Sequence, residues 1–149
     1  MQRVIRHWMQ VLLVPALLSA AFAAAAQSSV QGRDGVVVHY GTLNTNSLAA
    51  PVARRLGVQP RSSHALITLS PRNASGQALR ATASGSVRRL TGQRQILNFR
   101  VVEMDGEPQD LIAEFEIQNG EHLNFEIEVD TAGSPYPVEI RFRQQFYRD

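Results

Sequence analysis

Apolar and polar residues alternate strictly in the C-terminal part of this chain, and this pattern constrains the fold more than any other feature. The clearest segment is His122–Asp130, where Leu, Phe, Ile and Val alternate with Asn, Glu and Asp. Leu111–Ile117 and Tyr136–Phe146 follow the same period of two. Successive side chains of a strand point to opposite faces, so each segment predicts a strand with one buried face. Such alternation is typical of antiparallel sheets.

Four further segments predict strands, because they are rich in β-branched residues or alternate in polarity. One of them is rich in Ala, Ser and Gly, which indicates a bulged or edge strand; as an edge, with Ser84 near its centre, it could take up a peptide by strand addition. The four segments are Gly35–Tyr40, Ser63–Ser70, Ala78–Leu90 (the edge candidate) and Gln95–Glu103.

Two further predictions concern the inward residues of one strand and the segment before the first strand. Within Gln95–Glu103, the side chains of Leu97, Phe99 and Val101 should face inward. Gln27–Asp34 is polar and contains Gly, so we interpret it as a loose N-terminal lead.

One short helix is predicted between the first two strands. Asn46 or Ser47 can cap its start, Pro51 suits its first turn, and Gly57 can end it. The face that we expect to be buried holds residues spaced four apart, namely Leu48, Val52 and Leu56.

Two loops that contain glycine predict β-hairpins. In each, a loop of three residues keeps inward side chains opposite one another, whereas a loop of two would not. The predicted loops and pairs are Met104–Gly106 with Phe99 opposite Leu111, and Gln118–Gly120 with Phe115 opposite Leu123.

The strand count predicts the fold class. About seven short strands with one helix after the first strand favour an immunoglobulin-like β-sandwich, with a small β-barrel as the alternative. The chain has no Cys, so no disulfide stabilises this fold.

Residues 1–26 resemble a secretory signal peptide. Arg3 and Arg6 precede the apolar run Val11–Leu18, and small residues, interrupted only by Phe22, follow up to Ala26. We expect cleavage after Ala26 and a single domain over residues 27–149, with no transmembrane anchor left after cleavage.

The charges are divided between the two halves of the expected domain. Residues 27–100 contain ten Arg and one acidic residue, whereas residues 101–149 contain three Arg and twelve acidic residues. We interpret this division as neutralisation between strands of the two halves, with a bipolar surface as the alternative. The near-zero net charge of residues 27–149 argues against nucleic-acid binding.

Two segments near the start of the domain, Val38–Leu48 (VHYGTLNTNSL) and Pro51–Val58 (PVARRLGV), resemble an uncharacterised family of exported proteobacterial proteins. That family is domain of unknown function 4426 (DUF4426). Glu114–Ile117, Phe125–Val129 and Arg141–Tyr147 are similar to it as well. The resemblance implies a β-rich domain in the periplasm of a Gram-negative bacterium. It implies no activity and no catalytic residues.

The sequence contains no recognisable catalytic or metal-binding motif. His39, His64 and His122 are not at metal-ligand spacing, and no serine lies in a nucleophile motif. Glu114 and Glu116 are paired carboxylates, but their alternation places them on a solvated face. We therefore predict no catalytic residues, no metal and no cofactor.

The segment from Tyr40 to Ser47 is the strongest candidate for a binding site. Its polar residues suit turn and cap formation, and they also suit a shallow site whose rim carries arginines. The candidate binding residues are His39, Tyr40, Asn44, Asn46, Arg54 and Arg55.

Two functions follow from these features. The first is a non-enzymatic periplasmic binding or accessory module for a protein or peptide partner, which the absence of a catalytic motif favours. The alternative is an enzyme that acts on an envelope polymer or a small ligand, with His39 and a nearby carboxylate in its site. The sequence leaves the oligomeric state open.

Overall fold

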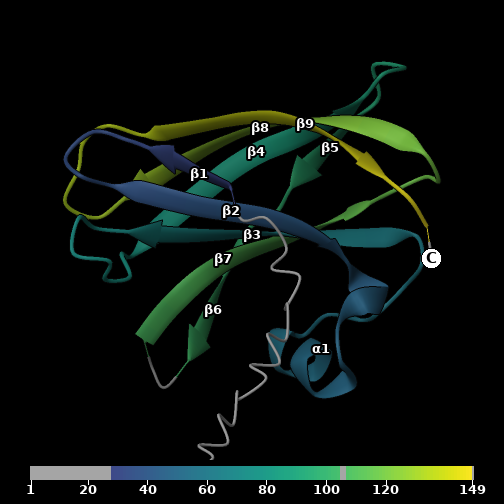
Figure 1. Ribbon diagram of the computed structural model, residues 1–149, viewed down its shortest axis with the longest axis horizontal. Helices are drawn as coiled ribbons and strands as arrows, with labels where there is room; N and C mark the ends of the chain where they lie inside the picture. The colour runs from purple at the N-terminus through teal and green to yellow at the C-terminus, as the bar shows by residue number, and fades with distance from the viewer. Residues whose placement is uncertain (1–27, 105–106, 149) are drawn as a thin grey trace, which may run out of the picture.

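The computed structural model describes residues 28–104 and 107–148, which form two antiparallel sheets packed face to face (Figure 1). The predicted signal peptide lies outside the described residues. Among the residues that the structure describes, no helix is long and apolar enough to cross a membrane. The five-stranded sheet has the order β1 (Ser28–Gln31), β2 (Val37–Asn44), β3 (His64–Arg72), β7 (Glu107–Glu116) and β6 (Arg100–Met104). The four-stranded sheet has the order β5 (Arg94–Leu97), β4 (Ala81–Arg89), β8 (Glu121–Thr131) and β9 (Val138–Phe146).

The predicted β-sandwich is confirmed, and the described strands do not close into a barrel. They number nine, because two features of the sequence hide strands. β1 is short and polar and lies in the segment predicted to be a loose lead. The predicted strand Gln95–Glu103 divides into β5 and β6, which belong to different sheets.

The main core lies between the two sheets. The inward faces of β3, β7, β8 and β9 are buried as their alternation predicted, with Ile67, Phe115 and Phe125 among the residues 3% exposed or less. The rings of Phe115 and Phe125 meet edge to face across the sheets, with centroids 5.2 Å apart. Val101 is 46% exposed, so the prediction that it faces inward is wrong.

A second apolar cluster covers the outer face of the five-stranded sheet. Leu66 and Ile112 are fully buried there beneath the helical connection, which consists of a 3₁₀ turn (Thr45–Ser47) and α1 (Ala50–Leu56). α1 lies below this sheet in Figure 1. This covering explains why β3 is apolar at consecutive positions and not only at alternate ones.

The predicted helix exists, but two of its details are wrong. Neither Asn46 nor Ser47 caps it, because α1 begins after Ala49 without a side-chain cap. The left-handed Gly57 ends it as predicted. Ala53 is the buried helix residue, whereas Val52 is 45% exposed.

Neither predicted hairpin register is correct. Phe115 lies opposite Ala65 of β3, and Leu123 belongs to the other sheet, so residues 118–120 connect the two sheets. β6 and β7 do form a hairpin, but Val101 lies opposite Leu111, two residues away from the predicted partner Phe99. The register shifts again after Val102.

β4 is an inner strand, which corrects the prediction of an edge strand at Ala78–Leu90. β8 pairs with all of β4, and β5 pairs with Gly85–Arg88 on the opposite side. The close approach of β4 and β8 explains the glycine at position 85: a Cβ atom there would lie 2.6 Å from the carbonyl oxygen of Glu126. Ala81–Ser84, the first half of β4, has no described strand on its second side.

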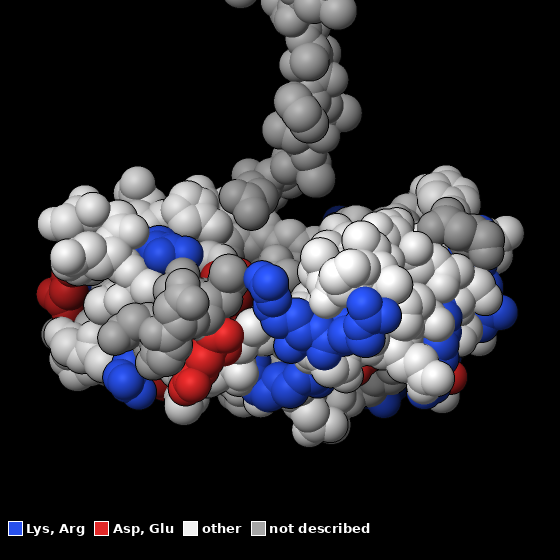
Figure 2. All heavy atoms as spheres, turned by 90° about the horizontal axis from the view of Figure 1, so that it is seen from below, with Lys and Arg blue, Asp and Glu red and all other residues white. Residues whose placement is uncertain are grey.

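The two oppositely charged halves of the sequence are interleaved in space. All three ion pairs of the described residues join an Arg of the first half to an acidic residue of the second. Basic and acidic side chains also meet near the middle of the face seen from below (Figure 2). The structure therefore agrees with neutralisation between strands. The pairs are Arg72–Asp110, Arg89–Glu121 and Arg100–Glu114.

Candidate functional site

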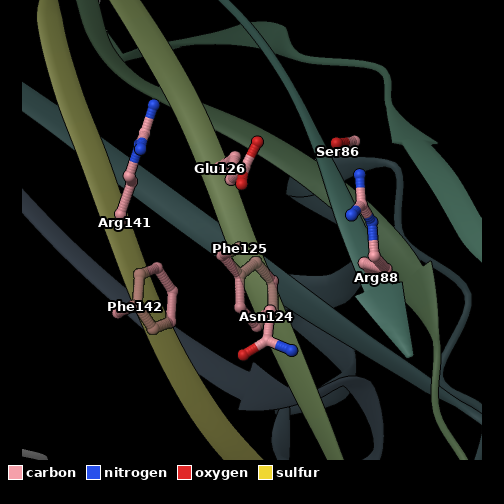
Figure 3. Close-up of a pocket in the computed structure, with 7 residues that line it drawn as sticks. All are labelled: Ser86, Arg88, Asn124, Phe125, Glu126, Arg141 and Phe142. Carbon is pink, nitrogen blue, oxygen red and sulfur yellow. The ribbon is translucent and has the colours of Figure 1, made fainter. Parts of the chain in front are cut away.

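The outer face of the four-stranded sheet is hollowed along β4. Ser84 and Ser86 are short outward residues, and the neighbouring strands β8 and β9 carry longer side chains on the same face. One hollow on this face has a volume of about 410 Å³ and lies over β4, β8 and β9 (Figure 3). Its lining residues are Ser86, Arg88, Asn124, Phe125, Glu126, Arg141 and Phe142.

Strand register gathers arginines from three strands at one end of this face, and two of them, Arg88 and Arg141, line the hollow. Arg88 lies opposite Asn124 on one side and Arg94 on the other, and Asn124 lies opposite Arg143. In the next row across the sheet, Arg141 lies opposite Glu126. This end of the face is therefore basic, although its arginines come from three different strands.

None of these four arginines forms an ion pair with another described residue. No described carboxylate oxygen lies within 4.0 Å of a guanidinium nitrogen of Arg88, Arg94, Arg141 or Arg143. Arg88 and Arg141 stand on either side of Glu126 in Figure 3. A guanidinium presents several N–H donors in one plane, which suits recognition of carboxylates by two parallel hydrogen bonds.

The other end of the same face is acidic. Glu128 of β8 lies opposite Glu139 of β9, and Asp130 follows further along β8. A second hollow of about 200 Å³ reaches this end and shares Ser86, Glu126 and Arg141 with the first. We call the two hollows together the β4 trough. Its charge changes from basic to acidic along the strands.

A separate hollow of about 730 Å³ lies on the outer face of the five-stranded sheet, around His39. His39 is half-buried in β2, opposite Ser29 of β1 and Ser70 of β3. The Ser70 hydroxyl donates a hydrogen bond to Asp110, whose carboxylate also lies 4.0 Å from Arg72. β3 separates β2 from β7, so the backbones of His39 and Asp110 are about 10 Å apart.

Two of the predicted binding residues connect the sheets. The ring of Tyr40 lies 4.8 Å from that of Phe142, centroid to centroid, and so joins β2 to β9. The Asn44 side-chain amide donates to the carbonyl oxygen of Tyr147 at 2.7 Å. Both residues lie on the inward face of β2, opposite to the face of His39.

The other three predicted residues lie on the helical connection. Asn46 is exposed in the 3₁₀ turn, and Arg54 and Arg55 are exposed in the last turn of α1. α1 packs on the outer face of the five-stranded sheet, and Tyr40 points to its inner face. The structure therefore does not bring Tyr40, Arg54 and Arg55 into one site.

Sequence reasoning missed the arginines of the β4 trough. The outward positions of β9 were predictable from alternation, and Arg141 is one of them. The convergence with Arg88 was not predictable, because β4 and β9 both pair with β8 and are far apart in the sequence. The relevant signal was an Arg on the outward face of each of several strands.

Within the described residues, no group of three or more His, Asp or Glu side chains is arranged to hold a metal ion. The fold and its shallow polar hollows define an antiparallel two-sheet β-sandwich protein. Residues 30–149 match the family model "Domain of unknown function (DUF4426)", so the chain belongs to this family, as its sequence motifs predicted.

A solved structure supports this assignment. A DUF4426 family protein from Pseudomonas aeruginosa PAO1, with a crystal structure at 2.09 Å resolution, is similar to this chain with 28% sequence identity and a TM-score of 0.72. The similarity covers 83% of this chain and 96% of that chain. No protein with a curated description matches this chain.

Proposed function

We propose that this chain is an exported, non-enzymatic binding module that holds an acidic segment of a protein partner in the β4 trough. The observation that carries this proposal is the set of arginines at the basic end, whose guanidinium groups have no described carboxylate within 4.0 Å. The signal-like residues 1–26 support export, and the family resemblance supports a periplasmic location.

The lining of the trough fits an acidic peptide better than an isolated anion. Arg88 and Arg141 offer charge to carboxylates, while Ser86 and Asn124 offer hydrogen bonds to a peptide backbone. Glu126 stands between the two arginines and disfavours a dense anionic group there. A segment with spaced carboxylates avoids Glu126 and reaches both guanidinium groups.

The test is an NMR titration with a synthetic peptide of alternating Glu and Val, against a matched peptide of Lys and Val. The Glu peptide should shift amide signals of β4, β8 and β9. The double variant Arg88→Glu/Arg141→Glu should weaken its binding at least tenfold, since each lost charge pair removes part of the affinity.

The matched control is Arg54→Glu/Arg55→Glu, which makes the same charge change on α1 at the other layer of the sandwich. It should leave the affinity within twofold. An equal loss in both variants would show non-specific attraction and contradict the proposal. A loss only in the α1 variant would instead place the site at Arg54 and Arg55.

A second candidate function is catalysis in the hollow around His39. The hydrogen bond from Ser70 to Asp110, with the imidazole on the neighbouring strand, favours it. It predicts hydrolysis of p-nitrophenyl esters or glycosides above the buffer rate, lost in His39→Ala and Ser70→Ala proteins of unchanged stability. Absence of turnover in the unmodified protein, or a variant that only loses stability, would exclude this function.

A further inference from the structure

β4 is longer than the strand on one of its sides. β8 pairs with Ala81–Arg89, the whole of β4, whereas β5 pairs only with Gly85–Arg88. After Leu97 the chain leaves the four-stranded sheet and enters the other sheet at Arg100. The first half of β4 therefore has a described strand on only one side.

A hydrogen bond beyond the end of β4 shows which of its residues bond to β8. The amide of Ala132 donates to the carbonyl oxygen of Arg80 at 2.8 Å, in register with the β4–β8 pairing. Hydrogen-bonded pairs alternate along an antiparallel ladder. The even-numbered residues Thr82 and Ser84 therefore exchange their bonds with β8.

The odd-numbered residues of β4 point the other way. The amides of Leu79 and Arg89 donate to carbonyl groups outside β8, at 3.0 and 2.8 Å. Ala81 and Ala83 lie between them with the same orientation. No described strand pairs with the N–H and C=O groups of Ala81 and Ala83 on that side.

The space beside these groups is open, and its wall carries both apolar and basic side chains. A hollow of about 540 Å³ lies there, and its floor is formed by the small residues of β4. Ile96 on its wall is 62% exposed. Arg94 lies on the same wall, and the exposed Arg80 precedes Ala81. The lining residues are Ala83, Ser84, Gly85, Arg94, Ile96, Leu97, Asn98 and Phe99.

We propose that an extended acidic peptide adds as a short strand beside Ala81–Ser84, antiparallel to β4, and continues the line of β5. This proposal rests on the proposed function. The hollow beside Ala83 shares Ser84, Gly85 and Arg94 with the second hollow of the β4 trough, so one extended peptide can run from the trough to this edge. The free groups of Ala81 and Ala83 bond to the peptide backbone. One peptide side chain packs beside Phe99 and Ile96, and a neighbouring carboxylate meets Arg94.

The dimensions of the gap favour a peptide over a second copy of this chain. The gap is bounded by Leu79 and Gly85, whose backbone groups on this side of β4 already have partners. These two residues are six positions apart, which corresponds to about 20 Å of strand. β9, an edge strand of the same sheet, has nine residues and would exceed the gap. On the gap side of β4, Arg80 and Arg94 attract acidic side chains, whereas Glu128 and Asp130 lie beyond Ser84 and Thr82 on the far side of β4.

The direct test is amide hydrogen exchange, measured residue by residue on the protein with and without the Glu–Val peptide. In the free protein, the amides of Ala81 and Ala83 should exchange quickly, while those of Thr82 and Ser84 are slow. Saturating peptide should slow Ala81 and Ala83 at least tenfold. Slow exchange at both residues in the free protein would overturn the proposal, because the edge would then be closed.

Two sets of variants test the backbone contacts. N-methylation of the peptide at successive residues should weaken binding at every second position only. Ala83→Pro should weaken binding at least tenfold without a large loss of stability, because no strand of the described residues accepts a hydrogen bond from the Ala83 amide. Ser84→Pro should instead destabilise the protein, because it removes a bond to β8.

The outcomes separate this proposal from the proposed function. If the peptide binds and responds to Arg88→Glu/Arg141→Glu but leaves Ala81 and Ala83 unprotected, strand addition is wrong and the proposed function stands. If the peptide does not bind, both are wrong. A dimer in sedimentation equilibrium that Ala83→Pro dissociates would identify a second copy as the occupant and overturn the peptide proposal.

Discussion

At the scale of single residues, Gly85 occupies a place where β4 and β8 leave no room for a side chain. A Cβ atom would lie 2.6 Å from the carbonyl oxygen of Glu126 and 3.0 Å from the Cα atom of Ile127. Both are backbone atoms, so the strands must separate. We expect Gly85→Ala to lower the free energy of unfolding by about 2 kcal/mol, measured by urea denaturation. Gly41→Ala is the control, since a Cβ there meets no atom within 4 Å; equal effects would contradict this account.

A second single-residue prediction concerns Thr45, which is fully buried. Its hydroxyl group accepts a hydrogen bond from the amide of Arg61 and donates one to the carbonyl oxygen of Arg61, each at 2.9 Å. Thr45→Val keeps the shape but leaves that amide without a partner, which should cost about 1–3 kcal/mol of stability. The Arg61 amide should also exchange quickly in Thr45→Val and slowly in Thr45→Ser. Slow exchange in both would contradict this role.

At the scale of elements, α1 shows how the phase of a helix depends on where it begins. The spacing of Leu48, Val52 and Leu56 predicted one buried face, but Leu48 precedes α1 and ends the 3₁₀ turn. The spacing thus crosses a junction between two helix types, and Ala53 is buried instead. We expect Ala53→Leu to cost about 1–3 kcal/mol by overpacking, and Val52→Ala to change stability by less than about 0.5 kcal/mol. Thermal unfolding compares the two, and the reverse order would contradict the observed phase.

The sequence predicted the faces of the strands better than their partners. Alternation places Phe115 and Leu123 in the core correctly, because it depends only on which side of a strand a residue lies. It does not determine whether the next strand stays in the same sheet. β7 and β8 are neighbours in the sequence but belong to different sheets, which is why the predicted hairpin pair does not form.

The candidate site depends on partners that are distant in the sequence, so it was less predictable than the fold. Arg88 and Arg141 meet on one face only because β4 and β9 both pair with β8. The free backbone groups of Ala81 and Ala83 depend on where β5 leaves the sheet, which no local pattern marks. The predicted residues Tyr40 and Asn44 are polar for another reason: they connect β2 to β9 and the chain end.

At the scale of the whole molecule, ion pairs link the two charged halves of the sequence, and the burial of each pair decides how much it contributes to stability. Glu121 is the most shielded acidic partner, with a side chain 13% exposed, and it accepts from Arg89 Nε at 2.9 Å and from the amide of Gln118 at 2.6 Å. Glu114, 31% exposed, lies 3.7 Å from Arg100. Removing a shielded charge strands its partner, whereas water replaces an exposed one.

We therefore expect Glu121→Gln to lower the free energy of unfolding by about 2 kcal/mol, and Glu114→Gln by less than about 0.5 kcal/mol. The difference should persist in 1 M salt, because screening acts weakly on a shielded pair. Denaturant unfolding at low and high salt measures both effects. If the loss in Glu121→Gln disappeared in 1 M salt, the Arg89–Glu121 pair would behave as a surface contact, and β4 and β8 would depend on backbone and core packing alone.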